Sequence, residues 1–264
     1  MNVPGATPTP YLPHPPNGDA LLNLFCFHHA GADASAFRGW AEHLGPDVSV
    51  APIQLPGRAS RIRETRFTEL ELLAADVGKA LLPWLNRPYL FYGHSMGALL
   101  AYTVASRLGP DTLLPKALIV SGYPAPHLPH TLELQPDLTD RELMERLLGL
   151  GGLPAELADH QEWLEVLMPV IRDDLAMCAS HRPISFRRLP IPIHVLAGQH
   201  DPLVDVADVL AWQQHTSKLF RSETLPGRHF FPQERPAAFY AALLRAVSAW
   251  MPSSSMVRGP NEKP

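Results

Sequence analysis

The sequence predicts an α/β fold, in which helices cover both faces of a mostly parallel sheet. Short apolar segments that suit buried strands alternate with segments of helical periodicity along nearly the whole chain. One expected strand leads through Gly93-His94-Ser95-Met96-Gly97 directly into an apolar helix, a context typical of a nucleophilic serine. The 264 residues, 46% of them hydrophobic, suffice for a single α/β domain with a sizeable core.

Charge and cysteine content narrow the possible classes of protein. The formal net charge of −4 does not suggest a partner such as nucleic acid or a charged membrane, and no apolar run reaches the ~18 residues of a membrane span. The two cysteines, Cys26 and Cys178, cannot form a disulfide framework and are compatible with a reducing cytoplasm. We therefore expect a cytoplasmic protein, and nothing in the sequence requires more than a monomer.

The folded domain is expected over residues 21–251. Residues 1–20 include six prolines and lack a charged segment followed by a long apolar core, so we expect an irregular arm and not a secretory signal. Residues 252–264 have the composition of a disordered tail.

The first elements follow from apolar periodicity. Residues 21–27 form an expected strand, residues 28–33 form a loop of small residues, and residues 48–53 form a second short strand. Between the strands lies a helix with apolar residues at positions 37, 40, 41 and 44, which Asp33 or Ser35 can cap.

A longer helix is expected from Thr68 to Trp84. Thr68 and Glu71 have the spacing of a capping box, and Phe67 and Leu72 have that of a hydrophobic staple. One face of this helix is apolar and is expected to be buried, namely Leu70, Leu73, Ala74, Val77 and Leu81.

The remaining elements complete the alternation. Strands are expected at 89–92, 117–121 and 191–198, followed by a polar strand that ends at Leu225; helices are expected at 98–105, 206–215 and 236–251. Because such strands run parallel, their carboxyl ends meet at one edge of the sheet, where a site is expected.

Residues 122–188 interrupt this alternation with an acidic, helical segment. Leu138 to Leu143 repeat the staple and capping box, the helix they begin ends at Gly149, and a second helical pattern runs from Pro154 to Cys178. We interpret the insertion as a lid over the site; the alternative is an ordinary helical part of the core.

Ser95 is the expected nucleophile. A strained turn between strand and helix points its Oγ away from the backbone, and any Cβ at Gly93 or Gly97 would crowd that turn. A serine hydroxyl needs a base, and the base needs a group that orients it.

Asp201 and His229 are the expected acid and base. The chain order for this kind of site is serine, then an acid, then histidine, and both residues follow expected strands. His194, His200 and His215 are weaker alternatives for the base, since they lie mid-strand, beside the acid and on an apparent surface helix. Asp205 and Asp208 are the alternatives for the acid.

Acyl transfer also needs donors for the developing oxyanion. The backbone N–H of Met96, directly after the nucleophile, is one candidate, and that of Ala30, in the loop after the first strand, is the other. The chain needs no metal or redox cofactor for this chemistry.

A basic loop follows the second strand. Arg58, Arg61, Arg63 and Arg66 face only Glu64, which gives a local net charge of +3. The loop is either a solvated surface segment or a docking surface for an acidic partner or a phosphate.

Several motifs together resemble the type II thioesterases, the stand-alone α/β-hydrolases that serve non-ribosomal peptide and polyketide synthases. They are Phe25 to Gly31, Leu55 to Arg58, the Ser95 motif, Gly198 to Asp201 and Gly227 to Phe231. The pair His29-Ala30-Gly31 and Pro56-Gly57-Arg58 is the most specific part. One departure is Ala32, where the family usually has a second glycine, and it bears on the geometry of the Ala30 donor.

The resemblance implies the substrate and the partner. It implies an α/β-hydrolase fold, hydrolysis of acyl or aminoacyl thioesters on the phosphopantetheine arm of carrier proteins, and removal of misprimed or stalled groups. It also supports Ser95, Asp201 and His229 as the triad. The phosphopantetheine belongs to the carrier-protein substrate and is not a cofactor.

Three alternatives remain open at this point. A general esterase or lipase would act on free esters without benefit from a carrier protein. A chain-releasing domain within a synthase is not expected, because no carrier domain precedes residue 21 in this sequence. A non-catalytic binding protein of the same fold would not need the serine, acid and histidine set.

Overall fold

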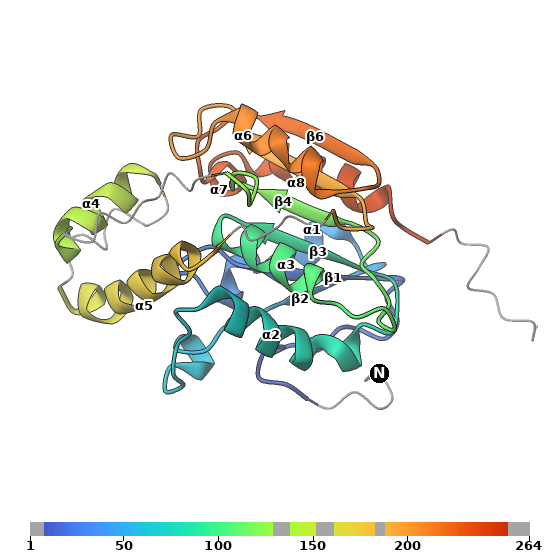
Figure 1. The fold of residues 1–264 in the computed structure, drawn as a ribbon, viewed down its shortest axis with the longest axis horizontal. Helices are drawn as coiled ribbons and strands as arrows, with labels where there is room; N and C mark the ends of the chain where they lie inside the picture. The colour runs from blue at the N-terminus through green and yellow to red at the C-terminus, as the bar shows by residue number, and fades with distance from the viewer. Residues whose placement is uncertain (1–7, 129–137, 152–160, 183–187, 253–264) are drawn as a thin grey trace, which may run out of the picture.

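The computed structural model describes residues 8–128, 138–151, 161–182 and 188–252. Within these ranges six strands form one sheet of order β2-β1-β3-β4-β5-β6, and all neighbouring strands are parallel. The strands are β1 (Leu22–Phe27), β2 (Val48–Pro52), β3 (Tyr89–His94), β4 (Leu118–Ser121), β5 (Ile193–Gly198) and β6 (Phe220–Leu225). The predicted parallel sheet is confirmed (Figure 1).

The helices lie between these strands in the chain. They are α1 (Trp40–Leu44), α2 (Leu70–Leu81), α3 (Met96–Ser106), α4 (Asp140–Gly149), α5 (Gln161–Ala179), α6 (Val206–Leu210), α7 (Phe231–Glu234) and α8 (Pro236–Ser248). Short 3-10 helices form η1 (Ala34–Phe37), η2 (Ala59–Arg61), η3 (Leu82–Trp84) and η5 (Ala211–His215).

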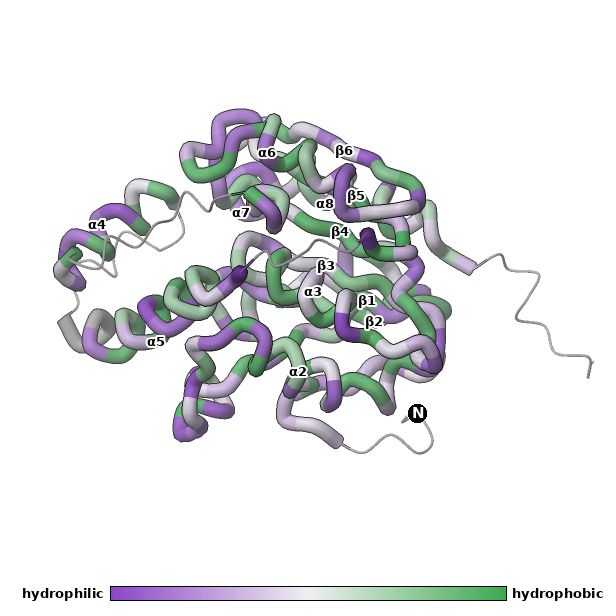
Figure 2. The backbone as a smooth tube through the Cα atoms, viewed as in Figure 1, coloured by the Kyte–Doolittle hydropathy of each residue, from purple (hydrophilic) through white to green (hydrophobic). Residues whose placement is uncertain are grey.

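Alternating side chains of the sheet build a hydrophobic core on each face. From β1, Phe25 and Phe27 pack on the side of α2 and α3, whereas Leu24 and Cys26 pack on the side of α1 and α8. Both faces are thus covered, so every residue of β1, β3 and β4 is buried and most of them are apolar or aromatic. Figure 2 shows the hydropathy along the backbone.

The expected face of α2 is confirmed, but the way the helix begins is not. All five apolar residues of that face are buried. The helix starts at Leu70, and the Leu70 N–H donates to the Ser180 Oγ at 2.9 Å, so the cap comes from the end of α5 and not from Thr68. The proposed staple is also wrong, because Leu72 is 60% exposed.

The first expected helix is interrupted. Residues 34–37 form η1 and residues 40–44 form α1, with Gly39 at φ 81° between them, a conformation that ends a helix. Asp33 caps η1 by accepting from the Ser35 N–H, as one of the two predicted caps.

The insertion between β4 and β5 contains α4 and α5, which lie together at the end of the molecule (Figure 1). The predicted capping box is confirmed, since Thr139 and Glu142 bond one another's backbone, and α4 ends at Gly149 as expected. α5 contacts both α4 and α3. The rest of the predicted segment, at 129–137, 152–160 and 183–187, lies outside the described residues, as does the predicted tail from 253 onward.

In the described ranges no helix combines the length and the hydrophobicity that crossing a membrane requires.

We expect Ser180→Ala to lower the free energy of unfolding by about 1 kcal/mol, because it removes the acceptor for the first N–H of α2. Urea unfolding followed by circular dichroism measures this change. Thr68→Ala is the matched control and should change stability by less than about 0.5 kcal/mol, since Thr68 is exposed. A larger loss with Thr68→Ala than with Ser180→Ala would restore the capping box.

Candidate active site

Ser95 occupies a strained turn between β3 and α3. Its φ of 53° and ψ of −124° are unusual for a residue with a side chain. A Cβ at Gly93 would lie 2.1 Å from the Gly97 oxygen, and one at Gly97 would lie 2.0 Å from the Phe27 oxygen, so the predicted need for both glycines is confirmed. The Ser95 N–H donates to the Ser121 oxygen at 2.8 Å, which anchors the turn to β4.

The structure brings Ser95, His229 and Asp201 together. His229 Nε2 lies 3.1 Å from Ser95 Oγ, and His229 Nδ1 lies 2.8 Å from Asp201 Oδ2. Because a carboxylate only accepts, Nδ1 carries the proton and Nε2 is free to accept one from the serine hydroxyl. This is the arrangement that activates a serine.

Backbone contacts hold the loops that carry the base and the acid. The Gln199 N–H donates to the Leu225 oxygen at 2.8 Å, and the His200 N–H donates to the Gly227 oxygen at 2.9 Å. Asp201 Oδ1 also accepts from the Leu203 N–H at 2.9 Å, so both oxygens of the carboxylate are oriented. The ends of β5 and β6 therefore position the pair.

The alternative bases lie elsewhere. His200 is exposed, and His194 is buried within β5, 3.5 Å from Glu223. The prediction that His215 lies on a surface helix is wrong, because His215 is 1% exposed and its Nδ1 bonds the Tyr102 hydroxyl.

The alternative acids also lie apart from the base. Asp205 precedes α6 and Asp208 lies within it, whereas the carboxylate that contacts His229 in the described part of the chain belongs to Asp201.

Met96 and Ala30, whose backbone amides are the predicted oxyanion donors, lie at the same pocket as the serine. Met96 begins α3, so its N–H has no acceptor within the helix, and both Met96 and Ala30 line the same pocket as Ser95. In the described part of the chain neither amide donates a hydrogen bond. Their availability fits the predicted oxyanion donors.

Three further histidines surround this centre and stay neutral. Burial lowers the pKa of His28 and of His94 well below the ordinary value, and it lowers the pKa of His29 to about 4. The His94 ring centre lies 5.3 Å from that of His229 and 6.0 Å from that of His29. Neutral neighbours leave an imidazolium at His229 free of nearby like charge.

A mainly apolar pocket, partly open to solvent, leads to Ser95. The insertion supplies part of its wall through Leu147 and Leu150, from α4 and the residue that ends it, and through Leu175 and Cys178 of α5. The pocket suits an apolar group attached to the reacting carbon.

The two cysteines, Cys26 and Cys178, are free and buried. Burial raises the thiol pKa of both, and the charge of Asp174 raises that of Cys178 further. Both thiols therefore stay protonated, and neither is an alternative nucleophile. Across the described residues no cluster of three or more histidine, cysteine or acidic side chains could hold a metal ion.

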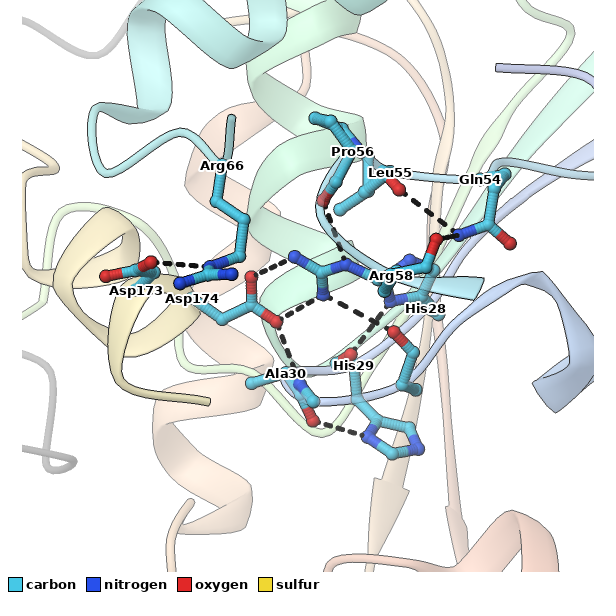
Figure 3. A network of polar contacts seen from close by, with 12 residues as sticks. His28, His29, Ala30, Gln54, Leu55, Pro56, Arg58, Arg66, Asp173 and Asp174 are labelled. Atoms are coloured by element: carbon cyan, nitrogen blue, oxygen red, sulfur yellow. Dashed lines mark hydrogen bonds and ion pairs between the residues drawn. The ribbon is translucent and has the colours of Figure 1, made fainter. Parts of the chain in front are cut away.

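Two arginines of the basic loop, Arg58 and Arg61, are neither solvated nor available as a docking surface. Arg58 and Arg61 are 6% and 7% exposed. Arg58 pairs with Asp174 of α5, as Figure 3 shows, and Arg61 pairs with Glu64 and lies over the Tyr11 ring. Both readings offered for this loop are wrong for these residues, because acidic partners lie within the chain itself.

Sequence reasoning missed three supporting residues. Ser121 Oγ lies 2.9 Å from His94 Nδ1, and Gly122, at φ 59°, leaves room for His94 and His229, since a Cβ there would lie 2.7 Å and 3.4 Å from these rings. Asp174 is the third. A serine that ends the strand next to β3, followed at once by a glycine, was a signal for the first two. Nothing local marks Asp174 among the acidic residues of the insertion.

Comparisons with known proteins show what the chain is similar to. The model of the thioesterase domain family matches residues 22–251. Linear gramicidin dehydrogenase LgrE of Brevibacillus parabrevis is 37% identical over 88% of this chain and 90% of its own length. The structure of the RedJ thioesterase of the prodiginine pathway of Streptomyces coelicolor is 37% identical, with a TM-score of 0.81 over 94% of this chain and 91% of that one. The type II thioesterase BorB of the borrelidin cluster is 31% identical, with a TM-score of 0.80 over 90% and 95%.

We expect His29→Gln to reduce the loss of stability in acid. The folded protein keeps His29 neutral down to a pKa of about 4, whereas the unfolded chain takes up that proton near its ordinary value of 6.5. Stability is therefore lost as pH falls from 6.5 toward 4, by up to roughly 3 kcal/mol for this residue.

Urea unfolding at several pH values between 4 and 7 measures this slope. The wild type, measured in parallel under the same conditions, provides the reference slope. An unchanged slope in His29→Gln would contradict the assignment of a neutral, partly buried His29.

Proposed function

The chain belongs to the thioesterase domain family, and from this membership we propose that it is a type II thioesterase. In this proposal it hydrolyses acyl or aminoacyl thioesters from the phosphopantetheine arm of carrier proteins in non-ribosomal peptide or polyketide biosynthesis. Removing misprimed or stalled groups in this way restores the free thiol of the carrier.

One observation carries the proposal. The hydrogen-bonded series Ser95–His229–Asp201 opens into an apolar pocket whose wall comes partly from the insertion. The Ser95–His229–Asp201 series supports acyl transfer as the reaction. The apolar pocket supports binding of the acyl group of the substrate.

The mechanism then follows from the chemistry of these groups. Ser95 Oγ attacks the thioester carbonyl carbon while His229 Nε2 accepts the hydroxyl proton, and Asp201 stabilises the imidazolium. The Met96 and Ala30 amides donate to the oxyanion. The C–S bond breaks, His229 gives its proton to the leaving thiol, and an acyl ester remains on Ser95.

Water completes the cycle. His229 accepts a proton from a water molecule that attacks the acyl-Ser95 carbonyl, and the same proton returns to Ser95 Oγ as the free acid leaves. The atoms and charges balance without a metal or redox group, so the proposal includes no cofactor. It also includes a lid role for the insertion, a cytoplasmic location and a monomer.

The names of the relatives support a role in biosynthetic pathways more than they support any single activity. RedJ and BorB are named as thioesterases of biosynthetic pathways, whereas LgrE is named a dehydrogenase. The Ser95–His229–Asp201 series favours hydrolysis for this chain. Oxidation or reduction of nicotinamide by the purified protein would favour the other chemistry.

Ser95→Ala and His229→Ala are each expected to lower kcat by about 10⁴-fold or more, because the nucleophile or its base is lost. Both variants should keep the circular dichroism spectrum of the wild type, and neither Ser95→Ala nor a heat-unfolded sample should react with a fluorophosphonate. Near-normal turnover by either variant would refute the triad.

A comparison of three substrates tests the proposed function. One acyl group is offered on a phosphopantetheinyl carrier protein, as a coenzyme A thioester and as a simple oxygen ester. We expect kcat/KM to be highest for the carrier form, since only that form presents both the thioester and a protein partner. Equal or better use of the oxygen ester would favour a general esterase.

A further inference from the structure

A buried ion pair joins the insertion to the loop after β2. Arg58 NH1 and NH2 lie 2.6 and 2.7 Å from the two oxygens of Asp174, and the side chains are 7% and 3% exposed (Figure 3). The pair is bidentate, which fixes the relative orientation of the two groups as well as their distance. α5 is thereby held to the loop that ends at Arg58.

The same carboxylate holds the loop after β1. The Gly31 N–H donates to Asp174 Oδ2 at 2.8 Å, and Arg58 NH1 also donates to the Ala32 oxygen at 3.3 Å. Gly31 and Ala32 directly follow Ala30, whose N–H is the proposed oxyanion donor. The position of that donor therefore depends on the ion pair one residue away.

α5 itself lies against this loop. Gly31 has a φ of 77°, and a Cβ there would lie 2.7 Å from Ile171 Cγ1. Leu175 and Cys178, on the same helix as Asp174, line the pocket. One helix thus supplies a wall of the pocket and the acceptor that holds the loop of the oxyanion donor.

From these contacts we propose that Asp174 and Arg58 are positioning residues for the oxyanion site, which is complete only when α5 is seated on the loop after β1. The inference rests on the proposed function in that it takes the Ala30 N–H as a donor to the oxyanion. A substrate whose binding holds α5 against the loop after β1 would therefore also align the Ala30 N–H, which stabilises the oxyanion formed from that substrate.

The Arg58–Asp174 pair is better suited to positioning the loops it joins than to stabilising the fold. A buried ion pair contributes little net stability compared with apolar residues of similar size, because both charges lose their hydration. The Asp174 carboxylate, however, accepts three N–H groups from two separate loops, a geometry that apolar side chains cannot reproduce.

The neighbouring pair provides a matched control. Asp173 accepts from Arg66 Nε at 2.6 Å (Figure 3). These side chains are 33% and 28% exposed. This pair also joins α5 to the basic loop, yet among the described residues it makes no bond to residues 29–32. Asp173→Asn removes a charge from the same helix without removing the acceptor of the Gly31 N–H.

The experiment compares Asp174→Asn and Asp173→Asn on a p-nitrophenyl ester and on an acyl-carrier thioester, with active sites counted by fluorophosphonate labelling carried to completion. We expect Asp174→Asn to lower kcat per labelled site about 10-fold or more on both substrates, as a partial loss of one oxyanion donor, and to change KM less than about 3-fold. Asp173→Asn should stay within about 2-fold of the wild type.

Arg58→Met/Asp174→Leu keeps the test valid if the buried, unpaired Arg58 prevents Asp174→Asn from folding. The double variant removes both charges and should retain the melting temperature to within a few degrees, yet it should lose kcat to a similar extent. Unchanged kcat per labelled site, or an effect on KM alone, would overturn the proposal. A wild type without preference for the carrier form would refute the proposed function instead, since the ester measurement tests Asp174 independently.

Discussion

The close approach of α3 to β1 and β3 is the constraint on which the site depends. Only glycines at positions 93 and 97 allow it, since a Cβ at either would lie within about 2 Å of backbone atoms. The approach forces Ser95 into a strained conformation that the surrounding sheet must stabilise, and its N–H bond to Ser121 on β4 contributes to that. The Ser95 hydroxyl and the Met96 N–H, the first amide of α3, then lie close together, because the same turn positions both groups.

Around the serine, the neighbouring histidines are neutral, and the charged carboxylates are those that accept hydrogen bonds from specific donors. His28, His29 and His94 are neutral, while Asp201 and Asp174 each serve a specific set of donors. Asp201 orients the base from the β5 side, and Asp174 holds the loop after β1 from the insertion. The two carboxylates thus orient different groups, the His229 ring and the loop after β1, although they lie in different parts of the chain.

The sequence patterns correctly predicted those features that depend on interactions between residues close in the chain. The order of strands and helices, the turn at Ser95, the buried face of α2 and the Thr139 cap of α4 all depend on residues close in sequence. The errors involve partners far along the chain. Ser180, rather than Thr68, caps α2 from 110 residues away, and Asp174 neutralises Arg58 from 116 residues away. No periodicity or spacing in the sequence encodes such pairs, and the burial of His215 against Tyr102 is a third case.

Trapping the covalent intermediate tests the central claim most directly. Rapid acid quench of the wild type mixed with an acyl-carrier substrate, followed by intact mass measurement and peptide mapping, detects any acyl group on the protein. The account predicts an added mass equal to the acyl group on the peptide that contains Ser95, and its absence in Ser95→Ala. An acyl group on Cys178 or another residue, or turnover with no adduct in either protein, would contradict it.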